Sequence, residues 1–215
     1  MKNSRKDMTS LEHTKLLEQN PEWVAMMAEK QRKRQEIETY YLKLAEPIFK
    51  DLESVGVFVK SIGNLGAEEE SHKKAVPVLM KHLFIYYDDW LNSGIARALG
   101  RIKATEHWDI LVDMFCKTDR SIHPEFKDGL ACALFDTVTK KTLPEYISLL
   151  RDKRHGESRI LMVGKLRRSK QPEIIALVDE LFEDPDLRTE IGSWKRFKGR
   201  KICGCLSNEN TRQSY

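Results

Sequence analysis

The sequence has few of the residues that interrupt regular structure. It contains seven Pro and eleven Gly among 215 residues, too few for a collagen-like or linker-rich chain. It also lacks any apolar run close to the roughly 18 residues that a membrane-spanning helix needs. Hydrophobic residues make up 40% and charged residues 33%, which excludes a disordered chain because such chains have too little apolar surface to bury. The length supports one domain or two small ones.

Signatures of catalysis and of metal binding are missing as well. None of the six histidines forms a His-x-x-x-His or His-Glu-x-x-His pattern, and there is no phosphate-binding loop or Gly-x-Ser-x-Gly motif. The pair Cys203-Gly-Cys205 does not have the spacing of a zinc hook. The acidic pair Asp88-Asp89 stands at an expected helix start, where it complements the helix dipole. We therefore expect a non-enzymatic protein with no metal and no cofactor.

The net charge of +4 is a property of the C-terminal tail. Of the 37 basic and 33 acidic residues, six and one lie in residues 195–215, which leaves 31 basic and 32 acidic residues for the rest of the chain. A neutral body provides no broad electrostatic field to attract a polyanion. The charge pattern therefore favours a protein partner over nucleic acid.

Cysteine usage and the N-terminal residues indicate a cytoplasmic setting. Cys116 and Cys132 lie in apolar helical patterns and are predicted to be buried as small hydrophobic residues. The first residues carry charges that no apolar stretch follows, which is unlike a secretory signal. Free thiols fit a reducing compartment, and we expect no membrane partner.

Helix starts punctuate the whole chain, whereas strand signals are scarce. In Asn20-Pro21-Glu22, a capping residue precedes a proline at the first helical position and an acid in the first turn. Four further prolines are placed in the same way and also predict helix starts: Pro124, Pro144, Pro172 and Pro185. The sequence thus predicts an all-α protein.

Residues 1–43 are predicted to form an N-terminal helical extension. Its long helix, from about Pro21, has a thin apolar face interrupted by the charged stretch EKQRKRQE at 29–36. A basic helix of this kind can bind nucleic acid or a protein partner, and the same alternation of charge is typical of a solvated helix face. The sequence leaves these interpretations open.

Residues 44–197 repeat a short signature. It aligns Gly63, Gly100, Phe135, Gly164 and Gly192, at intervals of 37, 35, 29 and 28 residues, and each interval fits two helices with their turns. Between the copies, apolar residues recur at three- and four-residue steps, as in an amphipathic helix. The pattern predicts an α-solenoid of about five helical hairpins, followed by a basic tail at 198–215.

One copy of the signature resembles a known family. The segment NSGIARALGRI at 92–102 resembles the second helix of a HEAT repeat, where a small residue and an arginine precede Ala-Leu-Gly. Residues 127–134 and 156–164 are weaker copies, and the resemblance spans residues 44–194. It implies a HEAT-like α-solenoid of the small bacterial type, whose second helices line a concave surface. Two enzyme classes, the alkylpurine DNA glycosylases and the phycobilin lyases, also use HEAT-like helices.

Helical periodicity places Leu91, Ile95 and Leu99 on one face of the 91–102 helix, with Ser93 and Arg97 opposite. The alignment extends this outward face to paired positions in the other copies: Lys60 and Asn64, Arg97 and Arg101, Cys132 and Asp136, Leu161 and Lys165, and Thr189 and Ser193. The positions on the other side of these helices are predicted to be buried, and they are Leu99, Leu134, Val163 and Ile191.

The outward face mixes both signs of charge, whereas a DNA groove would carry Lys or Arg at nearly every position. The predicted function is a scaffold that binds another protein, as an adaptor or as an immunity protein that neutralises a toxin. A nucleic-acid-binding protein of the glycosylase type is the alternative. The identity of the partner and the oligomeric state stay open. The predicted partner-binding residues are Lys60, Trp90, Arg97, Arg101, Asp136 and Lys165.

Overall fold

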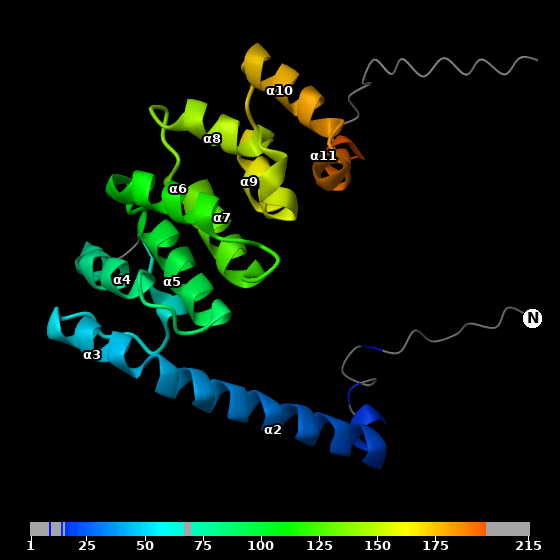
Figure 1. Cartoon of the computed structure of the whole chain (residues 1–215). Coiled ribbons are helices and arrows are strands. Elements are labelled where there is room, and N and C mark those ends of the chain that lie inside the picture. The colour runs from blue at the N-terminus through cyan, green and yellow to red at the C-terminus, as the bar shows by residue number, and fades with distance from the viewer. Residues whose placement is uncertain (1–8, 10–13, 15, 67–69, 197–215) are drawn as a thin grey trace, which may run out of the picture. The chain divides into compact units, whose positions relative to one another are not determined.

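The computed structural model describes residues 9, 14, 16–66 and 70–196 (Figure 1). All regular secondary structure in this part of the chain is helical, with no strand, so the all-α prediction is confirmed. The chain divides into two compact units after Phe58. The predicted boundary at residues 43/44 instead coincides with the end of the first long helix. None of the helices described is both long and apolar enough to cross a membrane.

The described part of the first unit includes the consecutive helices α2 (Pro21–Leu44) and α3 (Glu46–Ser54). Asn20 begins α2 as predicted, because its Oδ1 accepts a hydrogen bond from the backbone N–H of Glu22 at 2.9 Å. The 24 residues of α2 include none that is buried. Capping and side-chain pairs along the helix therefore stabilise α2, rather than a packed apolar face.

The second unit is built from helix pairs (Figure 1). Its helices are α4 (Val76–Leu83), α5 (Asp89–Ile102), α6 (Trp108–Lys117), α7 (Pro124–Thr137), α8 (Leu143–Arg151), α9 (Arg159–Val163), α10 (Pro172–Phe182) and α11 (Pro185–Arg196). Within each pair, the first helix (α4, α6, α8 or α10) packs against the helix that follows it. The second helices also pack in sequence, α5 against α7, α7 against α9 and α9 against α11.

The prolines mark helix starts throughout. The five predicted positions each fall at the first or second residue of a helix, which confirms them. Pro47 and Pro77 occupy the first turns of α3 and α4 in the same way. A proline is tolerated there because the first N–H groups of a helix have no partner within the helix.

The aligned positions Gly100, Phe135 and Gly192 lie in α-helices, Gly164 begins the 3₁₀ turn that follows α9, and the first copy does not form an α-helix. Residues 61–65, expected in a second helix, form only the 3₁₀ turn η1 (Ile62–Asn64). The side chain of Ser61 accepts a hydrogen bond from the N–H of Gly63, and Leu65 leaves the turn in an extended conformation. This local bonding competes with a continuing helix. Four α-helical pairs, rather than five, are present in the described part of the second unit.

The core of the second unit lies between consecutive second helices and between the two helices of each pair. Leu99, Leu134, Val163 and Ile191 are completely buried, as predicted. A Cβ atom placed on Gly129 would lie 2.6 Å from Cα of Ser93, so α5 and α7 approach each other at backbone distance. The prediction that Ser93 faces outward is therefore wrong: Ser93 is buried because a glycine faces it.

Candidate functional site

Arg97 links two second helices on the face predicted to bind a partner. Its Nη1 donates a hydrogen bond to Sγ of Cys132 in α7 at 3.0 Å, and its Nε contacts Oγ of Ser93 at 3.3 Å. Cys132 is half-buried and Cys116 is exposed, so the prediction that both are buried is wrong. Cys132 lies on the side of α7 that faces Arg97, and Cys116 occupies the last turn of α6.

Arg101 holds the segment that precedes the helix pairs. Its Nε donates to the carbonyl oxygen of Leu65 at 3.0 Å and its Nη2 donates to that of Ile62 at 3.2 Å. Burial lowers the pKa of Arg101 from its ordinary value, and the nearby carboxylate of Asp136 acts in the opposite direction. The guanidinium therefore ties α5 to η1 and to Leu65, the residue that follows it.

Asp136 lies between cations from neighbouring helices. Burial raises the pKa of the Asp136 carboxyl, while the charges of Lys165 and Arg101 lower it. Nζ of Lys165 donates to the carbonyl oxygen of Phe135 at 3.0 Å and lies 4.9 Å from the centre of the Phe135 ring. The second-helix face thus alternates positive and negative groups from α5 to the turn that follows α9.

The structure brings four of the six predicted site residues into one continuous face: Arg97, Arg101, Asp136 and Lys165. Trp90 begins the same stripe of α5, since it precedes Arg97 by seven residues, or two turns, and 56% of its surface is exposed. Lys60 is exposed and lies two residues before Ile62, whose carbonyl Arg101 binds.

An exposed apolar cluster, which sequence reasoning did not identify as a whole, continues from Trp90 along the helix ends. We call it the aromatic edge; its members are Phe84, Ile85, Tyr86, Trp90 and Ile122. The repeat pattern gave no signal for Ile122, because it lies in the turn between α6 and α7.

Contacts between two turns hold the aromatic edge together. The ring centre of Tyr86 lies 5.0 Å from that of His123, the neighbour of Ile122 in the α6–α7 turn. Oδ2 of Asp89 accepts a hydrogen bond from the N–H of Glu125 at 2.7 Å. Asp88 caps α5 by accepting from the N–H of Leu91. The acids of the Asp88-Asp89 pair therefore fix the helix ends beside the exposed rings.

Buried charged groups also occur away from this face. Nζ of Lys127 donates to the carbonyl oxygen of Thr118 at 2.8 Å and lies 5.0 Å from the Phe115 ring centre, and burial lowers the pKa of Lys127. The His155 ring lies 4.5 Å from the same ring centre, and burial lowers its pKa to about 4. Cys116 is exposed as a residue, and partial desolvation of its thiol raises the pKa, which keeps the thiol protonated and weakly nucleophilic.

Lys127 thereby ties α7 to Thr118, the residue that follows α6. Among the residues that the structure describes, no group of three His, Cys, Asp or Glu side chains could hold a metal ion. The pair Cys203-Gly-Cys205 and the basic tail lie outside the described residues.

No protein-family model, curated protein or solved structure matches this chain.

Proposed function

We propose that this chain is a non-enzymatic, HEAT-like α-solenoid scaffold that binds another protein through its second-helix face. The sequential packing of α5, α7, α9 and α11 supports the repeat interpretation, because stacked repeats contact only their neighbours. An adaptor or a toxin-neutralising immunity protein is the biological role we propose. The free thiols of Cys116 and Cys132 support a cytoplasmic location.

The aromatic edge beside Arg97 carries the proposal. Trp, Tyr and Arg are the residues most enriched at binding hot spots, and Trp90 and Tyr86 each expose more than half of their surface. The proposed surface extends from these rings over the charged residues of the second helices: Lys60, Arg97, Arg101, Asp136 and Lys165. Its mixed charges suit a protein surface, whereas Asp136 would repel the phosphates of the nucleic-acid alternative.

Site-specific photo-crosslinking tests the proposal. A photoreactive phenylalanine analogue replaces Tyr86 in one variant and Glu173, an exposed residue of α10, in the control. Expressed in the source cells, the Tyr86 variant should form a crosslink to one protein that the Glu173 variant does not form. With that protein purified, Trp90→Ala should weaken binding at least about 30-fold, while Glu173→Ala should leave the Kd unchanged.

Two results would overturn this function. One is crosslinking at position 86 that does not exceed the level at position 173. The other is tight binding of a DNA duplex by the full chain at about 0.15 M salt, weakened by Arg97→Ala, which would favour the nucleic-acid alternative.

A further inference from the structure

Helix α2 carries apolar side chains near each end, and no described residue of its own unit fully buries any of them. Trp23 and Met26 lie near the N-terminal end, and Ile37 and Tyr40 lie near the C-terminal end. Met26, Ile37 and Tyr40 each expose more than half of their surface, and α2 as a whole buries no residue. A 24-residue helix that buries nothing has its apolar side chains available to a partner.

These side chains belong to one regular seam. Positions 23, 26, 30, 33, 37 and 40 follow one another at alternating steps of three and four residues, which is the spacing of the contact positions in a two-helix coiled coil. The central positions are Lys30 and Lys33, and Arg34 lies beside them. We call the six positions, together with Arg34, the α2 seam.

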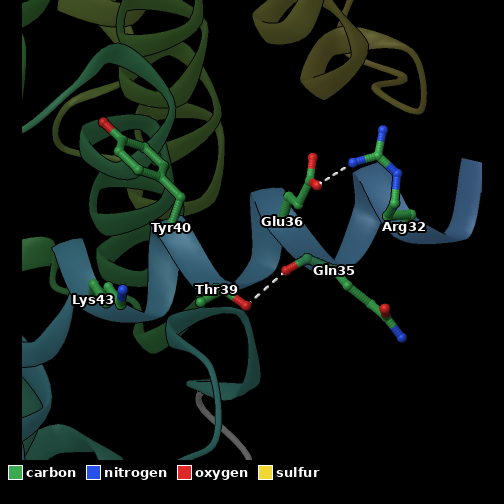
Figure 2. Close-up of a pocket in the computed structure, with 6 residues that line it drawn as sticks. All are labelled: Arg32, Gln35, Glu36, Thr39, Tyr40 and Lys43. Carbon is green, nitrogen blue, oxygen red and sulfur yellow. Dashed lines mark hydrogen bonds and ion pairs between the residues drawn. The ribbon is translucent and has the colours of Figure 1, made fainter. Parts of the chain in front are cut away.

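The positive charges at the centre of the α2 seam are largely unpaired with acidic side chains of α2. Arg32, which is not a seam position, binds Glu29 at 2.8 Å. It also binds Glu36 at 2.6 Å (Figure 2). Lys33 reaches Glu29 at 3.4 Å, a carboxylate that Arg32 already binds. Lys30 and Arg34 make no ion pair with any residue that the structure describes.

The open hollow on α2 meets the α2 seam only at Tyr40. Six exposed residues of one helix line it (Figure 2): Arg32, Gln35, Glu36, Thr39, Tyr40 and Lys43. Most of them lie on the side of Arg32, so the hollow is the space between side chains that already make contacts within α2. For example, Oγ1 of Thr39 donates a hydrogen bond to the carbonyl oxygen of Gln35 at 2.8 Å.

From this arrangement we propose that α2 docks an amphipathic helix of another protein, one that presents carboxylates between two apolar contacts. Apolar residues at both ends of the partner would bury the ends of the α2 seam, and its acids would meet Lys30, Lys33 and Arg34. Opposite charges at such positions set partner choice and orientation in paired helices. This surface lies in the first unit and is independent of the second-helix face.

The chemistry of the seam argues against the other occupants. A second copy of α2, parallel or antiparallel in register, would place Lys30 and Lys33 against lysines. A lipid surface would draw the seam into its apolar boundary, whereas interfacial helices carry their lysines on the polar face. Nucleic acid would match the three cations but would leave Met26 and Ile37 facing phosphates.

Two synthetic peptides serve as probes for the full-length protein. Both are labelled 24-residue helices with the same alternating spacing and Leu at the outer contact positions; the first has Glu at the central positions and the second has Lys. Fluorescence anisotropy at about 0.15 M salt should give a micromolar Kd for the Glu peptide and at least about tenfold weaker binding for the Lys peptide.

Single charge reversals then locate the contact. Lys30→Glu should weaken binding of the Glu peptide at least about tenfold and strengthen binding of the Lys peptide. Lys43→Glu makes the same charge change in the same helix but on the side of Arg32, and should leave both affinities within about twofold of those of the parent protein. Because α2 buries no residue, both variants should keep their helix content, which circular dichroism checks.

The proposal fails if neither peptide binds, if both bind alike, or if Lys43→Glu acts as strongly as Lys30→Glu. It also fails if sedimentation shows self-association that Lys30→Glu changes, or if phosphatidylserine vesicles or a 24-base-pair DNA duplex bind through Lys30 more tightly than the Glu peptide. None of these measurements involves Trp90 or Arg97. A failure of the α2 proposal is therefore distinct from a failure of the proposed function.

Discussion

The guanidinium of Arg159 and the carboxylate of Asp184 form a buried ion pair, with Nη1 and Oδ2 2.8 Å apart. Arg159 is fully buried and Asp184 nearly so. Nη2 of Arg159 also contacts Asp186 at 2.8 Å, and its other donors reach the carbonyl oxygens of Leu150 and Gly156. One side chain thus ties α9 to the end of α8 and to the start of α11.

Replacing Arg159 should strongly lower the stability of the folded protein. Arg159→Leu leaves the Asp184 carboxylate buried without a counter-charge, and the free energy of unfolding should fall by about 3–5 kcal/mol. The control is Arg151→Leu, which removes an exposed arginine that binds Glu180 at 2.7 Å and should cost less than about 1 kcal/mol. Urea unfolding of both variants measures the difference, and equal costs would contradict a buried role for the Arg159 pair.

His155 should make stability depend on pH. Burial lowers its folded-state pKa to about 4, mainly by desolvation, with Lys127, Arg154 and Arg159 adding to the effect and Asp152 opposing it. Its ordinary pKa is 6.5, so between these values the unfolded chain binds a proton that the folded protein does not. The contribution to stability is therefore complete above pH 6.5 and is lost as the pH falls toward 4.

Unfolding measured in urea at pH 7 and pH 5 should show a loss of about 2 kcal/mol from this histidine. In His155→Gln, which does not titrate, that part of the pH dependence should disappear even if the variant is less stable at both values. A pH dependence that the substitution leaves unchanged would assign the titration to another group.

Two glycines on second helices should respond in opposite directions to the same substitution. A Cβ on Gly129 would lie 2.6 Å from Cα and 2.8 Å from the carbonyl oxygen of Ser93, whereas a Cβ on Gly94 meets nothing within 4 Å. Gly129→Ala should therefore cost about 1–3 kcal/mol through overpacking. Gly94→Ala should add about 0.5–1 kcal/mol, because alanine is the better helix former in the interior of α5. Thermal unfolding distinguishes the two, and a stabilised Gly129→Ala would show that α5 and α7 are less closely packed.

Leu99 and Leu161 provide a matched test of the repeat core. Leu99 is completely buried, and 37% of the surface of Leu161 is exposed. Leu99→Ala should lower the free energy of unfolding by about 2–5 kcal/mol. Leu161→Ala should lower it by clearly less, because the Leu161 side chain buries less apolar area on folding and its truncation therefore loses less of it. Chemical denaturation of both variants tests which residues of the second helices face the core. Similar losses of unfolding free energy would mean that the assignment of inward and outward positions is wrong.

The helix starts and the residues of each helix that face the core were predictable, because both depend on the geometry of a single helix. Proline at a helix start and leucine at a fixed angular position follow from the geometry of one helix, and Pro124 and Leu134 behave accordingly. The first repeat copy failed because Ser61 bonds its own backbone and ends the turn after three residues. The six candidate site residues could be named from the pattern, but their contacts could not, because each depends on which helix lies alongside.

The sequence by itself determined an all-helical chain, its proline-marked helix starts and the residues that face the core of the second unit, because side-chain periodicity and capping act within a single element. Only the tertiary structure decided that Ser93 is buried, that Arg97 binds Cys132 and that Tyr86 lies beside His123. These facts depend on how closely two helices approach, which is set by glycines and side-chain volumes on both sides of the contact. Pattern within one helix carries no information about that distance.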